Sequence, residues 1–144
     1  MNLITSLKKN WQIFALVLAI FILLLSLRTD KLVVQLGTQS FKLEVASSTE
    51  DKAIGLSGRE SLGKNEGMIF SSNESEEMCM WMKEMRFNLA IIWVDSKKVS
   101  HIEPDISPAT YPEPYCHRAD HVIEVNVDDL RSSGLKVGDK INLE

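Results

Sequence analysis

The sequence lacks the short motifs that identify the most common catalytic sites. It has no glycine-rich phosphate loop, no nucleophile elbow, no Cys-x-x-Cys pair and no predicted helix with two histidines four residues apart. Internal repeats and low-complexity tracts are also missing. These absences exclude the familiar nucleotide-binding and hydrolase signatures. We therefore expect no cofactor, and the sequence favours a non-enzymatic role without deciding the question.

Basic residues are too few for a nucleic-acid-binding domain. The chain has 16 Lys and Arg against 20 Asp and Glu, a net charge of −4. Residues 1–30 carry Lys8, Lys9 and Arg28 against Asp30, which leaves residues 31–144 at −6. Because affinity for nucleic acid comes mainly from basic side chains that neutralise phosphates, no nucleic-acid partner is expected.

Charge is missing altogether from residues 10–27, an apolar run of 18 residues. As a helix this run spans about 27 Å, close to the roughly 30 Å hydrocarbon core of a bilayer. Lys8 and Lys9 precede it and favour a cytoplasmic N-terminus. We predict a cytoplasmic segment at 1–9, a transmembrane signal-anchor at 10–27 and an extracytoplasmic domain at 28–144. A cleaved signal peptide is the main alternative, but the residues after Leu25 lack a small-x-small cleavage pattern.

Cysteine is scarce, and both cysteines, Cys79 and Cys116, lie in the predicted exported part. An oxidising compartment permits a disulfide between them, which closes a loop of about 37 residues. Two independent thiols are the alternative, because the sequence does not give the distance between the two residues.

Short apolar or alternating runs separated by turn residues dominate the exported part. Strands are expected near 32–36, 40–46, 68–70, 78–83, 89–94, 99–103, 121–127 and 140–143. Short helices are expected at 49–54, after a Ser cap and before Gly55, and at 128–133, before Gly134. The serine- and glutamate-rich residues 71–77 and the proline-rich residues 104–114 are expected to be loops. The fold class is therefore mainly β, a small barrel or jelly-roll-like sandwich preceded by one transmembrane helix.

Methionine is concentrated in one predicted strand, at Met78, Met80 and Met82. Thioethers are soft ligands that favour Cu(I), and His101 and His121 lie elsewhere in the chain. This soft-metal site is one alternative function. Core packing or an apolar ligand groove is the favoured interpretation, because methionine commonly fills irregular apolar gaps.

Two further features suggest a binding surface or a reactive thiol. Arg59, Lys83 and Glu124 stand beside apolar runs and either converge on a pocket or point to solvent. Tyr111 lies in the proline-rich stretch, which is suited to contact a sugar or a peptide. Cys116 precedes a histidine, so a thiol-dependent enzyme is a third alternative, weakened because adjacent residues rarely face each other.

Several blocks together resemble a known family. They are Gly55 to Arg59, Gly67-Met68-Ile69-Phe70, Trp81-Met82-Lys83, Leu89 to Asp95, Pro108 to Pro112, Val122 to Asn126 and Gly138-Asp139. In order and spacing they are similar to the domain-of-unknown-function 192 family over about residues 32–144. The resemblance implies a compact, mainly β domain of jelly-roll or barrel type, often exported behind one apolar segment, with no settled activity.

The resemblance also implies which polar residues belong together. Its signature falls on Arg59, Trp81, Met82, Lys83, Asp95, Tyr111 and Glu124, which we predict to line a ligand-binding groove. Two positions depart from the family pattern, since Ala90 stands where Asp is usual and Glu84 where Asn is usual. The missing acid favours a binding or structural role. The predicted partner is an envelope polymer or another exported protein.

Overall fold

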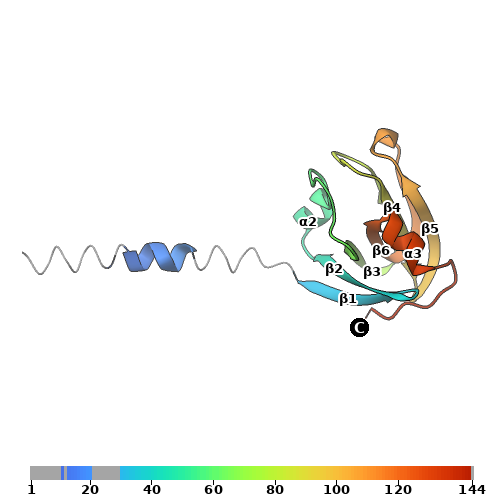
Figure 1. Cartoon of the computed structure of the whole chain (residues 1–144), viewed down its shortest axis with the longest axis horizontal. Coiled ribbons are helices and arrows are strands. Elements are labelled where there is room, and N and C mark those ends of the chain that lie inside the picture. Colours follow the sequence, from blue (N-terminus) through green and yellow to red (C-terminus); the bar gives the residue numbers. More distant parts are fainter. Residues whose placement is uncertain (1–10, 12, 21–29, 144) are drawn as a thin grey trace, which may run out of the picture. The chain divides into compact units, whose positions relative to one another are not determined.

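The structure is a computed structural model that describes residues 11, 13–20 and 30–143. It divides into two units, residues 1–30 and residues 31–144 (Figure 1). In the first unit residues 13–20 are helical. Within the described residues, no helix is both long enough and apolar enough to cross a membrane. Residues 10, 12 and 21–27 of the predicted anchor lie outside the described residues.

The second unit is built on one six-stranded sheet with the order β1-β2-β3-β6-β4-β5. Its strands are β1 (Lys31–Leu36), β2 (Gln39–Ala46), β3 (Glu66–Met80), β4 (Leu89–Asp95), β5 (Lys98–Ile106) and β6 (Tyr115–Asn126). Its helices are α2 (Thr49–Ile54), the 3-10 helix η1 (Pro108–Thr110) and α3 (Val127–Ser133). β2 and β3 pair in parallel, and every other neighbouring pair is antiparallel.

The fold is mainly β, as predicted, but the expected barrel or jelly-roll sandwich is wrong. β1 and β5 are the two ends of the strand order, and the described residues contain no ladder that joins them. The cause lies in β3 and β6, which run for 15 and 12 residues. β3 joins the strand expected at 68–70 to the beginning of the one expected at 78–83, and β6 begins before the strand expected at 121–127. The domain therefore has fewer and longer strands, and they form a single open sheet.

Local sequence explains the first elements. Gly37 has φ +57° in the β1–β2 turn, where a Cβ would lie 2.2 Å from the Ser133 carbonyl oxygen, so only glycine fits. α2 begins with a capping box, because the Asp51 amide donates to Ser48 Oγ and the Ser48 amide donates to Asp51 Oδ2, both at 3.0 Å. Gly55, also at positive φ, ends the helix as predicted.

Three local predictions are wrong. Residues 71–77, expected as a loop, continue β3 across a register shift between Ser71 and Glu76, and residues 76–80 pair with 115–119 of β6. We call this two-stranded extension, residues 76–80 and 115–119, the arm. Pro104 lies within β5, where its missing N–H is tolerated because β5 is an edge strand. The strand expected at 140–143 is reduced to a single bridge between Lys98 and Lys140.

The central strands are buried on both sides, so the sheet has two apolar faces. Along β4, Ala90, Ile92 and Val94 point to one face, and Leu89, Ile91 and Trp93 point to the other. The first, which we call the closed face, also contains residues from β1, β2, α3 and the C-terminal segment, including Phe41, Leu130 and Ile141. The second, the pocket face, is covered by the segments 55–62 and 81–88, through Leu56, Met82 and Phe87.

Candidate functional site

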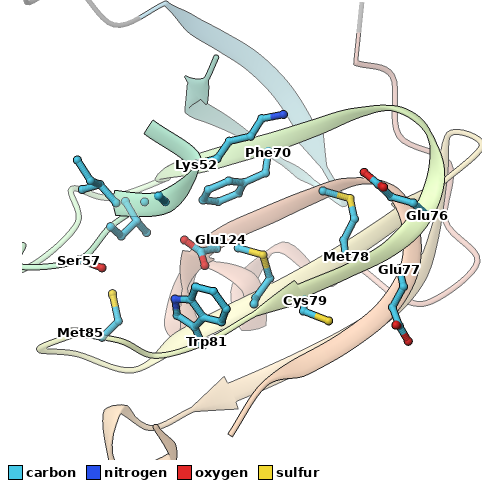
Figure 2. A pocket seen from close by; sticks show the side chains of 15 residues that line it. Lys52, Ser57, Phe70, Glu76, Glu77, Met78, Cys79, Trp81, Met85 and Glu124 are labelled. Atoms are coloured by element: carbon cyan, nitrogen blue, oxygen red, sulfur yellow. The ribbon is translucent and has the colours of Figure 1, made fainter. Parts of the chain in front are cut away.

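A pocket of about 420 Å³ opens on the pocket face. Its walls come from the end of α2, from the β3 side of the arm and from the turn that follows β3 (Figure 2). The lining residues are Lys52, Ala53, Ile54, Gly55, Leu56, Ser57, Phe70, Glu76, Glu77, Met78, Cys79, Met80, Trp81, Met85 and Glu124. The volume falls in the range of small-molecule and side-chain binding sites.

The walls of the pocket are mainly apolar and rich in sulfur. Met78, Met80 and Met85 line it together with Phe70 and Trp81. The Trp81 side chain is 51% exposed, so a large aromatic surface remains open to a partner. Flexible methionines beside an open indole are typical of surfaces that adapt to apolar ligands.

Glu124 is the buried polar group of this pocket. It lies on β6 opposite Met68 of β3 and Ile91 of β4, and it is 4% exposed. Burial raises the pKa of its carboxyl to about 8, and the positive charge of Arg59 opposes that rise. Figure 2 shows the carboxyl pointing into the pocket between Phe70 and Trp81. At neutral pH the group is therefore largely a neutral acid that can both donate and accept a hydrogen bond.

Gly67 explains how β3 comes so close to this part of β6. A Cβ at Gly67 would lie 2.2 Å from the Glu124 carbonyl oxygen and 3.0 Å from Leu43 Cδ2. A larger residue would push β3 away from β6 and from β2 at the base of the pocket. The glycine of the Gly-Met-Ile-Phe block is thus explained by backbone packing.

Arg59 is near the pocket but is already paired. Its Nη1 and Nη2 donate to the two carboxylate oxygens of Glu44 at 2.9 and 2.7 Å. These hydrogen bonds lower the pKa of Glu44 and raise that of Arg59. Arg59 therefore affects Glu124 through its charge, while its own hydrogen bonds hold β2 to the segment after α2.

The structure places two of the seven predicted groove residues, Trp81 and Glu124, in the pocket lining. Met82 is 1% exposed in the core of the pocket face. Lys83 is exposed, and its carbonyl accepts a hydrogen bond from Ser57 Oγ at 2.8 Å. Asp95 ends β4 opposite Lys98, and Tyr111 follows η1 with 48% exposure. These last two lie outside the pocket lining.

The residues of the predicted soft-metal site are also dispersed over different surroundings. Met78 and Met80 line the pocket, whereas Met82 is buried in the core. His121 Nδ1 lies 2.7 Å from Asp120 Oδ1. His101 instead stacks on His117 with ring centroids 3.6 Å apart.

The two cysteines face each other across the arm and form a disulfide with an S–S distance of 2.05 Å. The chain has only these two cysteines, so no free thiol is left. The predicted alternative of an enzyme that uses Cys116 is therefore wrong, because a bonded sulfur is not a nucleophilic thiolate. The bridge ties together the two strands of the arm, one of which forms a wall of the pocket.

Sequence reasoning missed the contributions of α2, Phe70 and Met85 to the pocket, whereas the apolar groove that it allowed for the methionine strand agrees with the place of Met78 in the lining. Phe70 belongs to a motif block, but the block does not say which face of the sheet it occupies. The alternation along β3 places Phe70 on the pocket face and Ile69 on the closed face. Ile54 is the one of these residues with a signal in the sequence, since it is an apolar residue at the end of a short polar helix. In the structure it is 53% exposed.

Comparison with known proteins identifies the family. Residues 32–143 match the family model of domain of unknown function 192 (DUF192), described as "Uncharacterized ACR". The chain belongs to this family. No curated protein is significantly similar to the chain.

Two solved structures of similar fold come from bacteria. A Sinorhizobium meliloti protein described as a candidate transcription regulator has 22% identity and a TM-score of 0.74, with 81% of this chain and 95% of that chain covered. A protein of unknown function from Novosphingobium aromaticivorans has 28% identity and a TM-score of 0.68, with 79% and 84% covered. The first likeness concerns the fold alone.

Proposed function

We propose that this domain is a binding module that holds an apolar segment of an exported polypeptide in the Glu124 pocket. The observation that carries the proposal is a buried carboxyl aimed into an apolar pocket beside a half-exposed tryptophan. Among the residues that the structure describes, Arg59 acts on this carboxyl through its charge and no hydrogen bond holds it, so it is available to a ligand in the pocket. Buried polar groups normally have a hydrogen-bond partner, which a ligand or a water molecule can supply here.

The chemistry of the walls favours a polypeptide over a glycan. A neutral carboxyl offers one donor and one acceptor, and a peptide group presents the matching acceptor and donor. Met78, Met80 and Trp81 supply the apolar surface for a side chain of that segment. A sugar needs many polar contacts. The lining is mostly apolar and offers few polar side chains, namely Lys52, Ser57, Glu76 and Glu77 in addition to Glu124, so it suits a sugar less well.

The same proposal includes a place for the domain outside the cytoplasm, tethered by residues 10–27. The uncharged run and the preceding Lys8 and Lys9 support the anchor and its orientation. The disulfide between Cys79 and Cys116 supports an oxidising compartment, because such bonds are rare in the cytosol. The full-length protein is then expected to remain in the membrane fraction after washes with high salt and carbonate. Release by either wash would contradict the anchor.

Binding can be tested with capped octapeptides that alternate leucine and serine, measured by calorimetry on the full-length chain. We expect the wild-type protein to bind them and Trp81→Ala to weaken binding at least about tenfold, as loss of a central aromatic contact does. Glu124→Leu should weaken binding as well, because it removes the donor and the acceptor. The matched control is Tyr111→Ala, which removes another half-exposed aromatic side chain outside the pocket.

Two outcomes would overturn the proposed function. One is equal affinity in the wild-type protein and Trp81→Ala, which would place binding elsewhere. The other is binding of soluble N-acetylglucosamine oligomers in place of the peptides, which would assign the pocket to an envelope polymer.

A further inference from the structure

A second cluster of functional side chains lies outside the pocket. His101 and Glu103 on β5 and His117 on β6 each offer a ligand atom, and all three atoms lie within 4.8 Å of one another. All three residues are partly exposed, and none belongs to the pocket lining. An ion could therefore reach the cluster from solvent without passing through the pocket.

The sheet geometry explains why two separated strands meet here. The last pair between β4 and β6 is Val94 with His121, so His117 lies on the arm beyond the end of that ladder. The β4–β5 ladder has a register shift after Trp93, which pairs with His101. β5 thus brings His101 and, two residues on along the same strand face, Glu103 toward His117.

Trp93 is a rigid support for both histidines. It is fully buried, and its Nε1 donates to the Met78 carbonyl oxygen at 2.9 Å. The rings of His101 and His117 lie edge-on to it, with centroids 5.8 and 4.8 Å away. They also stack on each other with only 19° between their planes. This packing keeps both imidazoles beside Glu103 at one place on the surface.

We propose that His101, Glu103 and His117 form a binding site for a divalent transition-metal ion, for which Zn²⁺ serves as the probe. Two imidazoles and one carboxylate are ligands that this ion accepts at about 2.0–2.2 Å, with a further position left to water. In tetrahedral geometry, ligand atoms at such distances from one ion lie about 3.3–3.6 Å apart. His101 Nε2 and Glu103 Oε1 are 3.0 Å apart, so they need to separate only slightly to hold one ion. His117 completes the set by a rotation of its ring about χ2, a torsion with a broad energy minimum.

The site differs from a soft copper site in its donor atoms. Imidazole and carboxylate suit borderline and harder divalent ions, whereas thioether favours Cu(I). The proposal is independent of the peptide pocket, since neither Trp81 nor Glu124 takes part.

Zn²⁺ titration of the full-length chain, purified with its disulfide intact, tests the site by calorimetry. We expect one equivalent to bind, and His101→Ala or His117→Ala to weaken binding by more than the roughly 10–100-fold that loss of an outer-shell partner costs. Glu103→Gln should weaken it by at least about 10-fold, because a neutral amide oxygen is a poorer ligand than the carboxylate. The matched control is His121→Ala, because the third histidine pairs with Asp120 outside the cluster and its loss should leave the affinity unchanged.

Ring NMR signals of the wild-type protein provide a readout that does not depend on the folding of any variant. Zn²⁺ should shift the signals of His101 and His117 and leave those of His121 in place. The proposal is overturned if the wild-type protein binds Zn²⁺ no better than the His101→Ala, His117→Ala double variant, or if His121 shifts as much as the other two.

Discussion

The two faces of the central sheet differ in how completely they are covered. On the closed face, strands β1 and β2, helix α3 and the C-terminal segment bury a continuous apolar cluster. On the pocket face, short irregular segments cover the sheet, and a cavity bordered by the end of helix α2 remains beside them. Glu124 and Val125 are neighbours on β6, yet Val125 packs in the closed cluster and Glu124 faces the cavity.

This difference separates stability from binding. A close-packed cluster stabilises the fold through burial and tolerates few changes. A face with an aromatic side chain left half exposed and a buried ionisable group is poorly optimised for stability alone, as binding sites commonly are. The predictions below change one face at a time and follow the effect on the other.

The largest effect is expected from a truncation on the closed face. Phe41 is fully buried there, and Phe41→Ala should lower the free energy of unfolding by about 3–5 kcal/mol, because it leaves a cavity in a packed cluster. Denaturant unfolding measures this loss. Trp81→Ala is the matched truncation on the pocket face and should cost much less. Equal losses for the two variants would contradict the distinction between the faces.

Removal of the disulfide should loosen the arm before it affects the rest. The Cys79→Ser, Cys116→Ser double variant should lose about 3–4 kcal/mol, as the chain-entropy description gives for a separation of 37 residues. Amide hydrogen exchange should accelerate first in residues 76–80 and 115–119, since the disulfide joins these two strands directly. Unchanged exchange in the arm, with acceleration confined to core amides such as those of Ile92 and Val94, would argue against a local role.

The buried carboxyl should make stability depend on pH in an uncommon direction. Its folded pKa is raised from the ordinary 4.5 to about 8, so the folded protein retains a proton that the unfolded chain has lost. The contribution of this carboxyl to stability is therefore complete below about pH 4.5 and decreases as pH rises toward 8, by at most about 1.4 kcal/mol per pH unit. Unfolding measured at pH 5 to 8 should show this slope in the wild-type protein, and Glu124→Gln should remove it.

How far the sequence predicts these features depends on the range of the interaction. The capping box of α2, the turn at Gly37 and the buried run 89–94 depend on neighbouring residues, and the structure contains them where the patterns indicate. The continuity of β3 was missed because Ser71 to Glu77 has the composition of a loop, and only pairing with β6 makes its end part of a strand.

The site shows the same limit. Family resemblance brought Trp81 and Glu124 together, but it also grouped Asp95 and Tyr111, which lie outside the pocket lining. The alternation of Ile123, Glu124 and Val125 was compatible with a solvent-exposed glutamate. That prediction fails when both sides of a strand are covered, as they are on β6. His101 and His117 come together through the strand register and through the part of β6 that continues beyond β4, which no sequence pattern predicts.

The smallest effect is expected in the turn that bounds the pocket. Glu84 has φ +55°, a conformation that asparagine and glycine adopt more readily than glutamate does. Glu84→Asn should therefore raise the free energy of unfolding by about 0.5–1 kcal/mol, measured by denaturant titration. Peptide affinity should stay unchanged, because Glu84 does not line the pocket. A loss of stability would mean that its side chain makes a contact that outweighs the backbone strain.

The most direct test of the central claim is a carboxyl ¹³C NMR titration of Glu124, with and without the apolar octapeptide. We predict a free-state midpoint near the pKa of about 8 that burial produces, and a shifted midpoint when the peptide is bound, because the ligand contacts the carboxyl. A midpoint near the ordinary 4.5 that is unaffected by the peptide would contradict the account.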